Sequence, residues 1–103
     1  MAYNIVMTQQ ADRDMDQILA YLTQQVFSEQ AAAALVVQYT DVLEKLEQFP
    51  NLFETVRNVG QVGKEYRKFR MGNYVGVYRV QEEEKRVIIL RIFHGSQNYA
   101  RYL

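Results

Sequence analysis

The sequence predicts an α+β fold in which an N-terminal strand, an antiparallel helix hairpin and a three-stranded antiparallel meander form one small sheet with its helices. Two observations predict it. Apolar residues recur every three or four positions between residues 8 and 49, and from residue 64 onwards short β-branched and aromatic runs alternate with turn residues. The length of 103 residues and the apolar fraction of 49% favour a single domain over residues 1–103.

The first two elements are a short strand and a helix. Residues 2–7 are rich in aromatic and β-branched types, and we expect this strand at an edge of the sheet. Thr8 is a candidate N-cap, and acidic residues follow it where the helix dipole favours anions: Asp12, Asp14 and Asp16. The apolar face of this helix is then Ala11, Met15, Ile18, Leu22 and Val26.

A second helix begins after Ser28, another candidate N-cap. Its apolar stripe is Ala32, Leu35, Val36, Tyr39, Leu43, Leu46 and Phe49. Pro50 cannot continue a helix, so the helix ends near Phe49. Because the link between the two helices is short, we expect them to lie antiparallel.

The second half of the chain predicts strands. Residues 50–63 show no periodicity and indicate a loop. The strands are expected at 64–71, 74–81 and 86–94, joined by a tight turn at Gly72-Asn73 and a charged turn at 82–85. The continuous apolar run Val87–Leu90 is typical of a central strand that is covered on both faces.

Composition excludes several classes of protein. There is no cysteine and only one histidine, His94, which excludes disulfide scaffolds, thiol catalysis and multi-histidine metal centres. We therefore expect no metal and no cofactor. No apolar run approaches the ~20 residues of a membrane span, and the N-terminus does not resemble a secretion signal. We expect a cytoplasmic protein with no membrane contact.

The charge distribution is uneven although the net charge is zero. Residues 1–56 carry eight acidic and two basic residues, whereas residues 57–103 carry four acidic and ten basic ones. The halves therefore differ in sign, −6 against +6. Such a division indicates a surface for a polyanion, or acidic helices that neutralise a basic sheet.

The strongest candidate site is the segment Lys64-Glu65-Tyr66-Arg67-Lys68-Phe69-Arg70. In a strand, Arg67 and Phe69 share one face while Lys68 and Arg70 share the other. Bases interleaved with aromatics suit single-stranded RNA, but long cationic side chains also protect a sheet edge.

Two further arginines and one histidine lie in the later strands. Arg79 and Arg91 stand in otherwise apolar strands, so each points to an open face or pairs with an acid. His94 ends the last strand, where a general acid–base role and a structural role both remain open.

Two segments resemble the RelE/ParE superfamily of type II toxins: "YRKFRMGNYVGVYRV" at 66–80 and "VIILRIFHG" at 87–95, after a helix that ends in "LEQFP" at 46–50. The resemblance implies a toxin that a cognate antitoxin holds inactive, in a complex that reaches operator DNA only through the antitoxin. In the RelE-like branch the toxin cuts messenger RNA on the ribosome. In the ParE-like branch it poisons DNA gyrase and cuts no RNA.

The same resemblance favours the ParE-like branch. The ribonucleases usually carry a base after the tyrosine that opens the second meander strand and another after the last-strand glycine. Here those positions hold Val75 and, in Gly95-Ser96-Gln97-Asn98, no base. A ribonuclease would have to use Arg70, His94 and Tyr99, together with Arg67 and Lys68. A third alternative is an inactive member that is kept for antitoxin binding and operon control.

For target or RNA binding the sequence therefore predicts a set of cations, which is Lys64, Arg67, Lys68, Arg70, Arg79 and Arg91.

Overall fold

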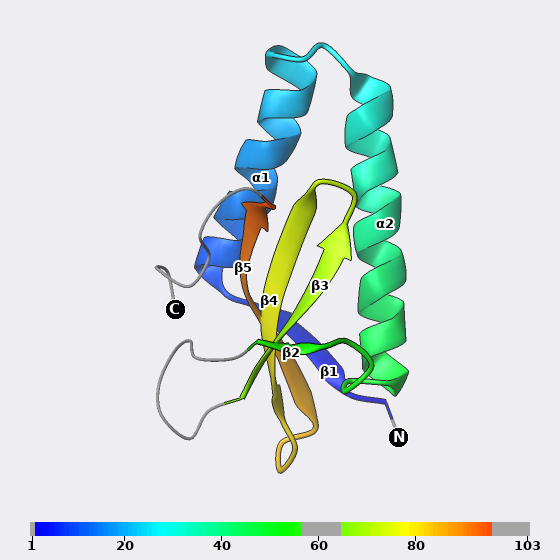
Figure 1. Ribbon diagram of the computed structural model, residues 1–103, viewed down its shortest axis with the longest axis vertical. Coiled ribbons are helices and arrows are strands. Elements are labelled where there is room, and N and C mark those ends of the chain that lie inside the picture. The colour runs from blue at the N-terminus through cyan, green and yellow to red at the C-terminus, as the bar shows by residue number, and fades with distance from the viewer. Residues whose placement is uncertain (1, 57–64, 96–103) are drawn as a thin grey trace.

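The computed structural model describes residues 2–56 and 65–95. The chain runs through β1 (Asn4–Met7), α1 (Gln9–Gln24), α2 (Glu29–Gln48), β2 (Thr55–Val56), β3 (Tyr66–Met71), β4 (Tyr74–Gln81) and β5 (Arg86–His94). Figure 1 shows the two helices as an antiparallel hairpin beside a twisted sheet, which confirms the predicted α+β fold.

Both predicted N-caps are confirmed. The Thr8 hydroxyl accepts a hydrogen bond from the amide of Ala11 at 3.0 Å, and the Ser28 hydroxyl accepts one from Ala31 at 3.0 Å. Each cap satisfies one of the amide groups that a helix start leaves without a partner. Between the helices Phe27 has a positive φ of 57° and an exposed ring.

Three residues that were predicted for the apolar helix faces are in fact exposed. Val26 follows the end of α1 at Gln24, and Val36 and Phe49 lie off the buried stripe of α2, with exposed fractions of 45% and 60%. Val42, which the predicted stripe omitted, is buried instead. The stripe is therefore narrower than the sequence pattern suggested.

The sheet has five strands in the order β1-β5-β4-β3-β2. β1 lies at an edge, as predicted, and pairs parallel with β5, so the sheet is mixed. The predicted meander is confirmed by antiparallel β3–β4 and β4–β5 pairs. β2 was not predicted: these two residues lie in the segment that was interpreted as loop, and they pair antiparallel with the start of β3.

β5 is an interior strand, as the apolar run predicted, but its two faces are not equally covered. Val87 and Ile89 are fully buried, whereas Ile88 and Leu90 are only half-buried. The register shifts by one residue next to Val77, which leaves Leu90 as the extra residue of a bulge in β5. The expectation of full burial on both faces was therefore wrong for this strand.

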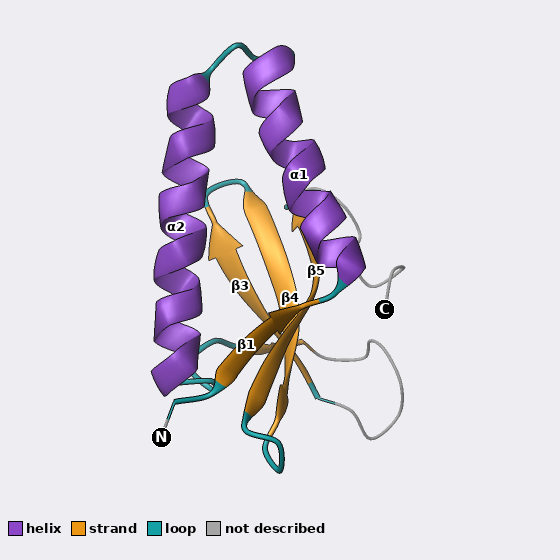
Figure 2. Cartoon of the chain, turned by 180° about the vertical axis from the view of Figure 1, so that it is seen from behind, coloured by secondary structure: helices purple, strands orange, loops and turns teal. Residues whose placement is uncertain are grey.

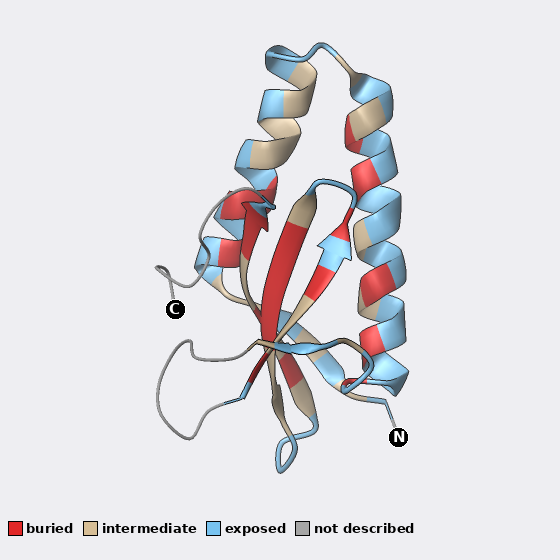
Figure 3. Ribbon diagram, in the orientation of Figure 1, coloured by how far each residue is buried: buried red, intermediate tan, exposed pale blue. Residues whose placement is uncertain are grey.

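The main core lies between the sheet and the helix hairpin, and Figure 2 shows both helices on one side of the sheet, while Figure 3 marks the buried residues of helices and strands in red. Rings of Tyr39, Phe53, Phe69 and Tyr78 meet at its centre, with centroids 6.0–6.5 Å apart. A Cβ on Gly76 would lie less than 3 Å from three atoms of the Phe69 ring, so only glycine fits this position.

A second, smaller cluster of buried residues lies on the opposite face of the sheet. It consists of Tyr66, Val77 and Phe93, with Val56 and Leu90 packed against it. We call this side the open face, since neither helix packs on it. Among residues 2–56 and 65–95, no helix is long and apolar enough to cross a membrane.

Candidate functional site

The open face carries cations from two neighbouring strands. In β3, Phe69 and Met71 pack into the main core, so the alternation of the strand directs Lys68 and Arg70 to the open face. In β4, Tyr78 and Val80 pack into the main core, so Arg79 is directed to the open face as well. The predicted division of the β3 side chains between two faces is thus confirmed.

Arg79 lies over an aromatic ring. Its guanidinium carbon is 6.0 Å from the centre of the Tyr66 ring, in the range of a cation–π contact. Its Nε is buried and meets no hydrogen-bond partner in the described part of the chain. An unsatisfied buried donor costs the fold free energy, and the Nε of Arg67 is in the same situation.

Lys68 and Arg70 flank the same surface. The Lys68 ammonium lies 3.5 Å from the Glu54 carboxylate, a partly exposed pair that contributes little to stability. Arg70 is exposed, and its Nη1 would lie 3.2 Å from a Cβ on Gly95, so it reaches the end of β5.

Arg67 points to the opposite side and is held inside the chain. Its Nη1 donates to the carbonyl oxygens of Asn51 at 3.3 Å and Phe53 at 2.6 Å, and its Nη2 lies 2.7 Å from the Glu65 carboxylate. These contacts fasten the segment before β2 onto β3. The binding role predicted for Arg67 stays a prediction, and its observed contacts are structural.

Arg91 pairs with an acid, which was one of the two alternatives that the sequence left open. Its Nε and Nη2 donate to the Asp14 carboxylate at 2.8 and 3.3 Å. The same carboxylate accepts from the Ile92 amide at 3.0 Å and from the Gln10 side chain at 3.1 Å. Asp14, which is 7% exposed, therefore joins α1 to β5 beside the bulge.

His94 and Arg70 lie on opposite faces of the sheet. His94 pairs across the ladder with Tyr74, which packs against the main core, whereas Arg70 pairs with Val75 on the open face. The His94 ring meets the Tyr74 ring edge-on, with centroids 5.6 Å apart and an angle of 85°. The structure thus brings these two candidate catalytic residues to the same end of the sheet but not to one surface.

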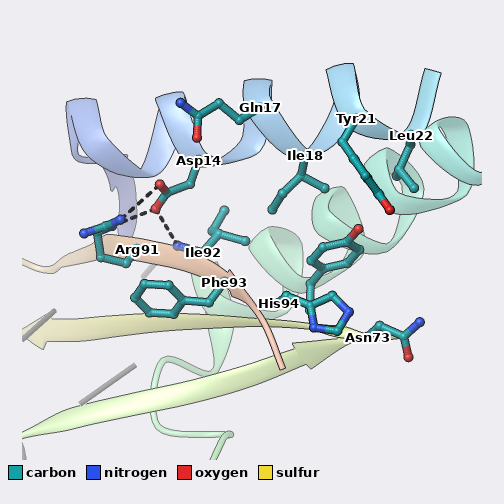
Figure 4. Close-up of a pocket in the computed structure, with 11 residues that line it drawn as sticks. Asp14, Gln17, Ile18, Tyr21, Leu22, Asn73, Arg91, Ile92, Phe93 and His94 are labelled. Carbon is teal, nitrogen blue, oxygen red and sulfur yellow. Dashed lines mark hydrogen bonds and ion pairs between the residues drawn. The ribbon is translucent and has the colours of Figure 1, made fainter. Parts of the chain in front are cut away.

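A groove runs between α1 and the end of β5, with a volume of about 600 Å³. We call it the α1 groove. In Figure 4, Ile18, Tyr21 and Leu22 project from the helix towards Phe93 and His94 of β5. The sequence did not predict this groove, because it depends on how α1 crosses the upper half of β5.

Val75, at the position where the resemblance expects an arginine, lies on the open face and is 3% exposed. It contributes no charge there.

Lys64, Gln97 and Tyr99, which the sequence analysis also singled out, lie outside the described residues. The sequence analysis did not single out Arg86, whose Nε donates to the Gln81 side chain at 2.8 Å. Within the described ranges, no three acidic or histidine side chains gather into a metal site.

A family model of the ParE toxin of the type II toxin–antitoxin system parDE matches residues 5–99. The chain belongs to the ParE toxin family. This confirms the RelE/ParE resemblance and identifies the protein as a type II toxin-antitoxin system toxin. A search of curated proteins finds no match to this ParE family member.

Solved structures of other toxins share the fold. The chromosomal ParDE system of P. aeruginosa matches with a TM-score of 0.68 and 21% identity, over 90% of this ParE chain and 96% of that one. The archaeal RelE-RelB complex of Pyrococcus horikoshii matches with a TM-score of 0.64 and 17% identity, over 94% and 99% of the two chains. At these identities the matches show the fold.

Proposed function

We propose that this ParE-family toxin acts by binding a type II topoisomerase such as DNA gyrase, and that it does not cut RNA. The family assignment supports this proposal, since the resemblance to the ParE-like branch implies gyrase poisoning. The observation that carries it is Val75, a buried valine on the open face near the start of β4.

Chemistry at the open face supports binding over catalysis. In-line cleavage of RNA needs an acid, a base and cations placed around one phosphate. The absence of a charged donor at Val75 alone would reduce such a rate by ~10²–10³. Moreover, Arg70 and His94 start from opposite faces of the sheet, which favours binding over their joint action on one phosphate.

The binding surface that we propose is the cationic part of the open face. Lys68, Arg70 and Arg79 lie there beside the Tyr66 ring, and Arg79 has an unpaired buried Nε. Arg67 and Arg91 contribute indirectly, because their contacts hold β2 and α1 in place. A surface of this kind favours a partner that offers carboxylates or phosphates.

We further propose that a cognate antitoxin neutralises the toxin in the cytoplasm, and that the toxin reaches operator DNA only through this antitoxin. The P. horikoshii relative was solved as a RelE-RelB complex, which is support by analogy. The positive charge that Lys68, Arg70 and Arg79 give to the open face favours an acidic, partly disordered segment of the antitoxin. A gene for a short protein with an acidic tail beside the toxin gene would support this.

The test is a supercoiling assay with purified gyrase and relaxed plasmid. We expect inhibition that rises with toxin concentration. The variant with Lys68→Gln, Arg70→Gln and Arg79→Gln should need at least about tenfold more protein, because three charge contacts are removed. The matched control, Arg13→Gln with Lys45→Gln, neutralises exposed helix cations and should inhibit like the unaltered chain.

A second assay separates the alternatives. Translating ribosomes with a defined message should yield intact transcript in the presence of the toxin. Codon-linked cuts with normal supercoiling would establish a RelE-type ribonuclease instead. Harmless expression without antitoxin, with no effect in either assay, would indicate an inactive member that is kept for operon control.

A further inference from the structure

The α1 groove has the size of a small-molecule site and lies between α1 and the end of β5, where it shares Phe93 with the open-face cluster. Its volume of about 600 Å³ falls within the roughly 300–1,000 Å³ of most ligand pockets. α1 forms one wall, the turn between β3 and β4 closes one end, and the last residues of β5 form the other wall. The groove is therefore built from three segments of the fold.

The walls of the groove favour a flat ring. Ile18 and Leu22 of α1 and Ile92 of β5 supply aliphatic surface. The Tyr74 and His94 rings stand at 85° to each other, so they form a corner. A planar ligand that stacks on one of these two rings presents its edge to the other ring. Stacked and edge-to-face contacts are both favourable arrangements of aromatic rings.

The charges of the groove are balanced within the protein. Asp14 and Arg91 are its carboxylate and its guanidinium, and they pair with each other at 2.8 Å. The two oxygens of Asp14 also accept from Ile92 and Gln10, so the carboxylate is fully engaged. The charges of Asp14 and Arg91 therefore cancel within the lining, which favours a neutral ligand over a triphosphate or a polycation.

The remaining polar groups of the lining are neutral and both donate and accept hydrogen bonds. They are the amides of Gln17 and Asn73 and the hydroxyls of Tyr21 and Tyr74. Burial raises the pKa of Tyr74, as does the nearby Tyr21, so this hydroxyl stays protonated at neutral pH. Side-chain amides match base edges, where a donor and an acceptor stand side by side.

We propose that the α1 groove binds a neutral planar nitrogen heterocycle of the nucleobase class, presented as a free nucleoside. An aromatic side chain of a partner protein fits the lining less well, since an indole offers a single hydrogen-bond donor and leaves the amides unmatched. This proposal is tested separately from the topoisomerase proposal, because Lys68, Arg70 and Arg79 do not line the groove.

The experiment titrates the full chain with adenosine, cytidine and uridine separately and follows backbone amide NMR shifts. We expect saturable binding with a Kd on the order of 1 mM or tighter for at least one nucleoside, with shifts at residues of the groove. Tyr74→Ala should weaken that binding about tenfold, because it removes the stacking ring. The matched control Tyr3→Ala changes a tyrosine beside Lys85, at the far end of the sheet, and should leave the Kd unchanged.

A second variant keeps the test decisive if Tyr74→Ala does not fold. Ile18→Trp fills the groove from the helix side and should abolish nucleoside binding while the other amide shifts stay native. No saturable binding up to about 5 mM of any of the three nucleosides would overturn the proposal. It would equally be overturned by binding that survives Ile18→Trp, or by tighter binding of N-acetyltryptophanamide than of every nucleoside.

Discussion

Two tyrosines of the core should respond in opposite ways to the same substitution. The Tyr78 hydroxyl is buried and donates to the carbonyl oxygen of Pro50 at 2.9 Å. The Tyr39 hydroxyl is also buried but meets no hydrogen-bond partner within residues 2–56 and 65–95. Both rings contact Phe69, so replacement of each tyrosine by phenylalanine preserves the aromatic packing and changes only the hydroxyl.

The expected free energies follow from these partners. Tyr78→Phe leaves the buried Pro50 carbonyl without its donor and should lower the free energy of unfolding by about 1–3 kcal/mol. Tyr39→Phe removes a hydroxyl whose desolvation is uncompensated, so the change should be between zero and a gain of about 1–2 kcal/mol. The difference between the two variants should therefore be at least about 1 kcal/mol.

Urea unfolding at neutral pH, followed by circular dichroism, measures both variants against the unaltered chain. An unchanged slope of the transition would show that each variant unfolds from an equally compact state. Equal losses in the two variants, or a loss of more than about 1 kcal/mol for Tyr39→Phe, would refute the reasoning, because the hydrogen bond would then not decide the cost.

Three further predictions concern the same core and its connection to α1. Burial raises the pKa of Tyr78 to about 12, so the unfolded chain ionises first and stability falls as the pH rises from 10 towards 12. Burial raises the pKa of Tyr39 to about 12 as well, so each tyrosine contributes up to about 2–3 kcal/mol to this fall, and Tyr78→Phe should remove only its own share in urea titrations at several pH values. Gly76→Ala should lower the free energy of unfolding by about 1–3 kcal/mol or more, because the new Cβ clashes with the Phe69 ring. Addition of Phe69→Leu to the same chain should recover part of that loss, so strictly additive effects in a double-mutant cycle would contradict the steric argument. Asp14→Asn should lower the free energy of unfolding by about 2–3 kcal/mol, since it breaks the ion pair between the buried Asp14 and the partly exposed Arg91. The exposed control Asp16→Asn should change that free energy by no more than about 0.5 kcal/mol, and equal effects of the two variants would contradict the role of Asp14.

Local signals in the sequence predicted most of the fold. Thr8 and Ser28 are polar residues directly before helical apolar patterns, and both cap helices as expected. The strands 74–81 and 86–94 coincide with β4 and β5 because turn residues bound them on both sides. In such segments the local preference and the tertiary structure agree, so the pattern alone was sufficient.

Features that depend on contacts between distant residues could not be read in this way. β2 has only two residues and shows no periodicity; it exists because it pairs with β3, and Arg67 holds the segment before it. Asp14 was interpreted only as an acid near a helix start, yet its main partner lies 77 residues away in β5. The α1 groove depends on that same crossing of α1 over the strand, so no local signal could have indicated it.

The most direct test of the central claim is a titration of purified toxin against purified gyrase, with plasmid supercoiling and the integrity of a translated message measured in parallel. We predict that supercoiling is inhibited while the message stays intact, and that inhibition depends on Lys68, Arg70 and Arg79. Unimpaired supercoiling together with a message cut at defined codons would contradict the account.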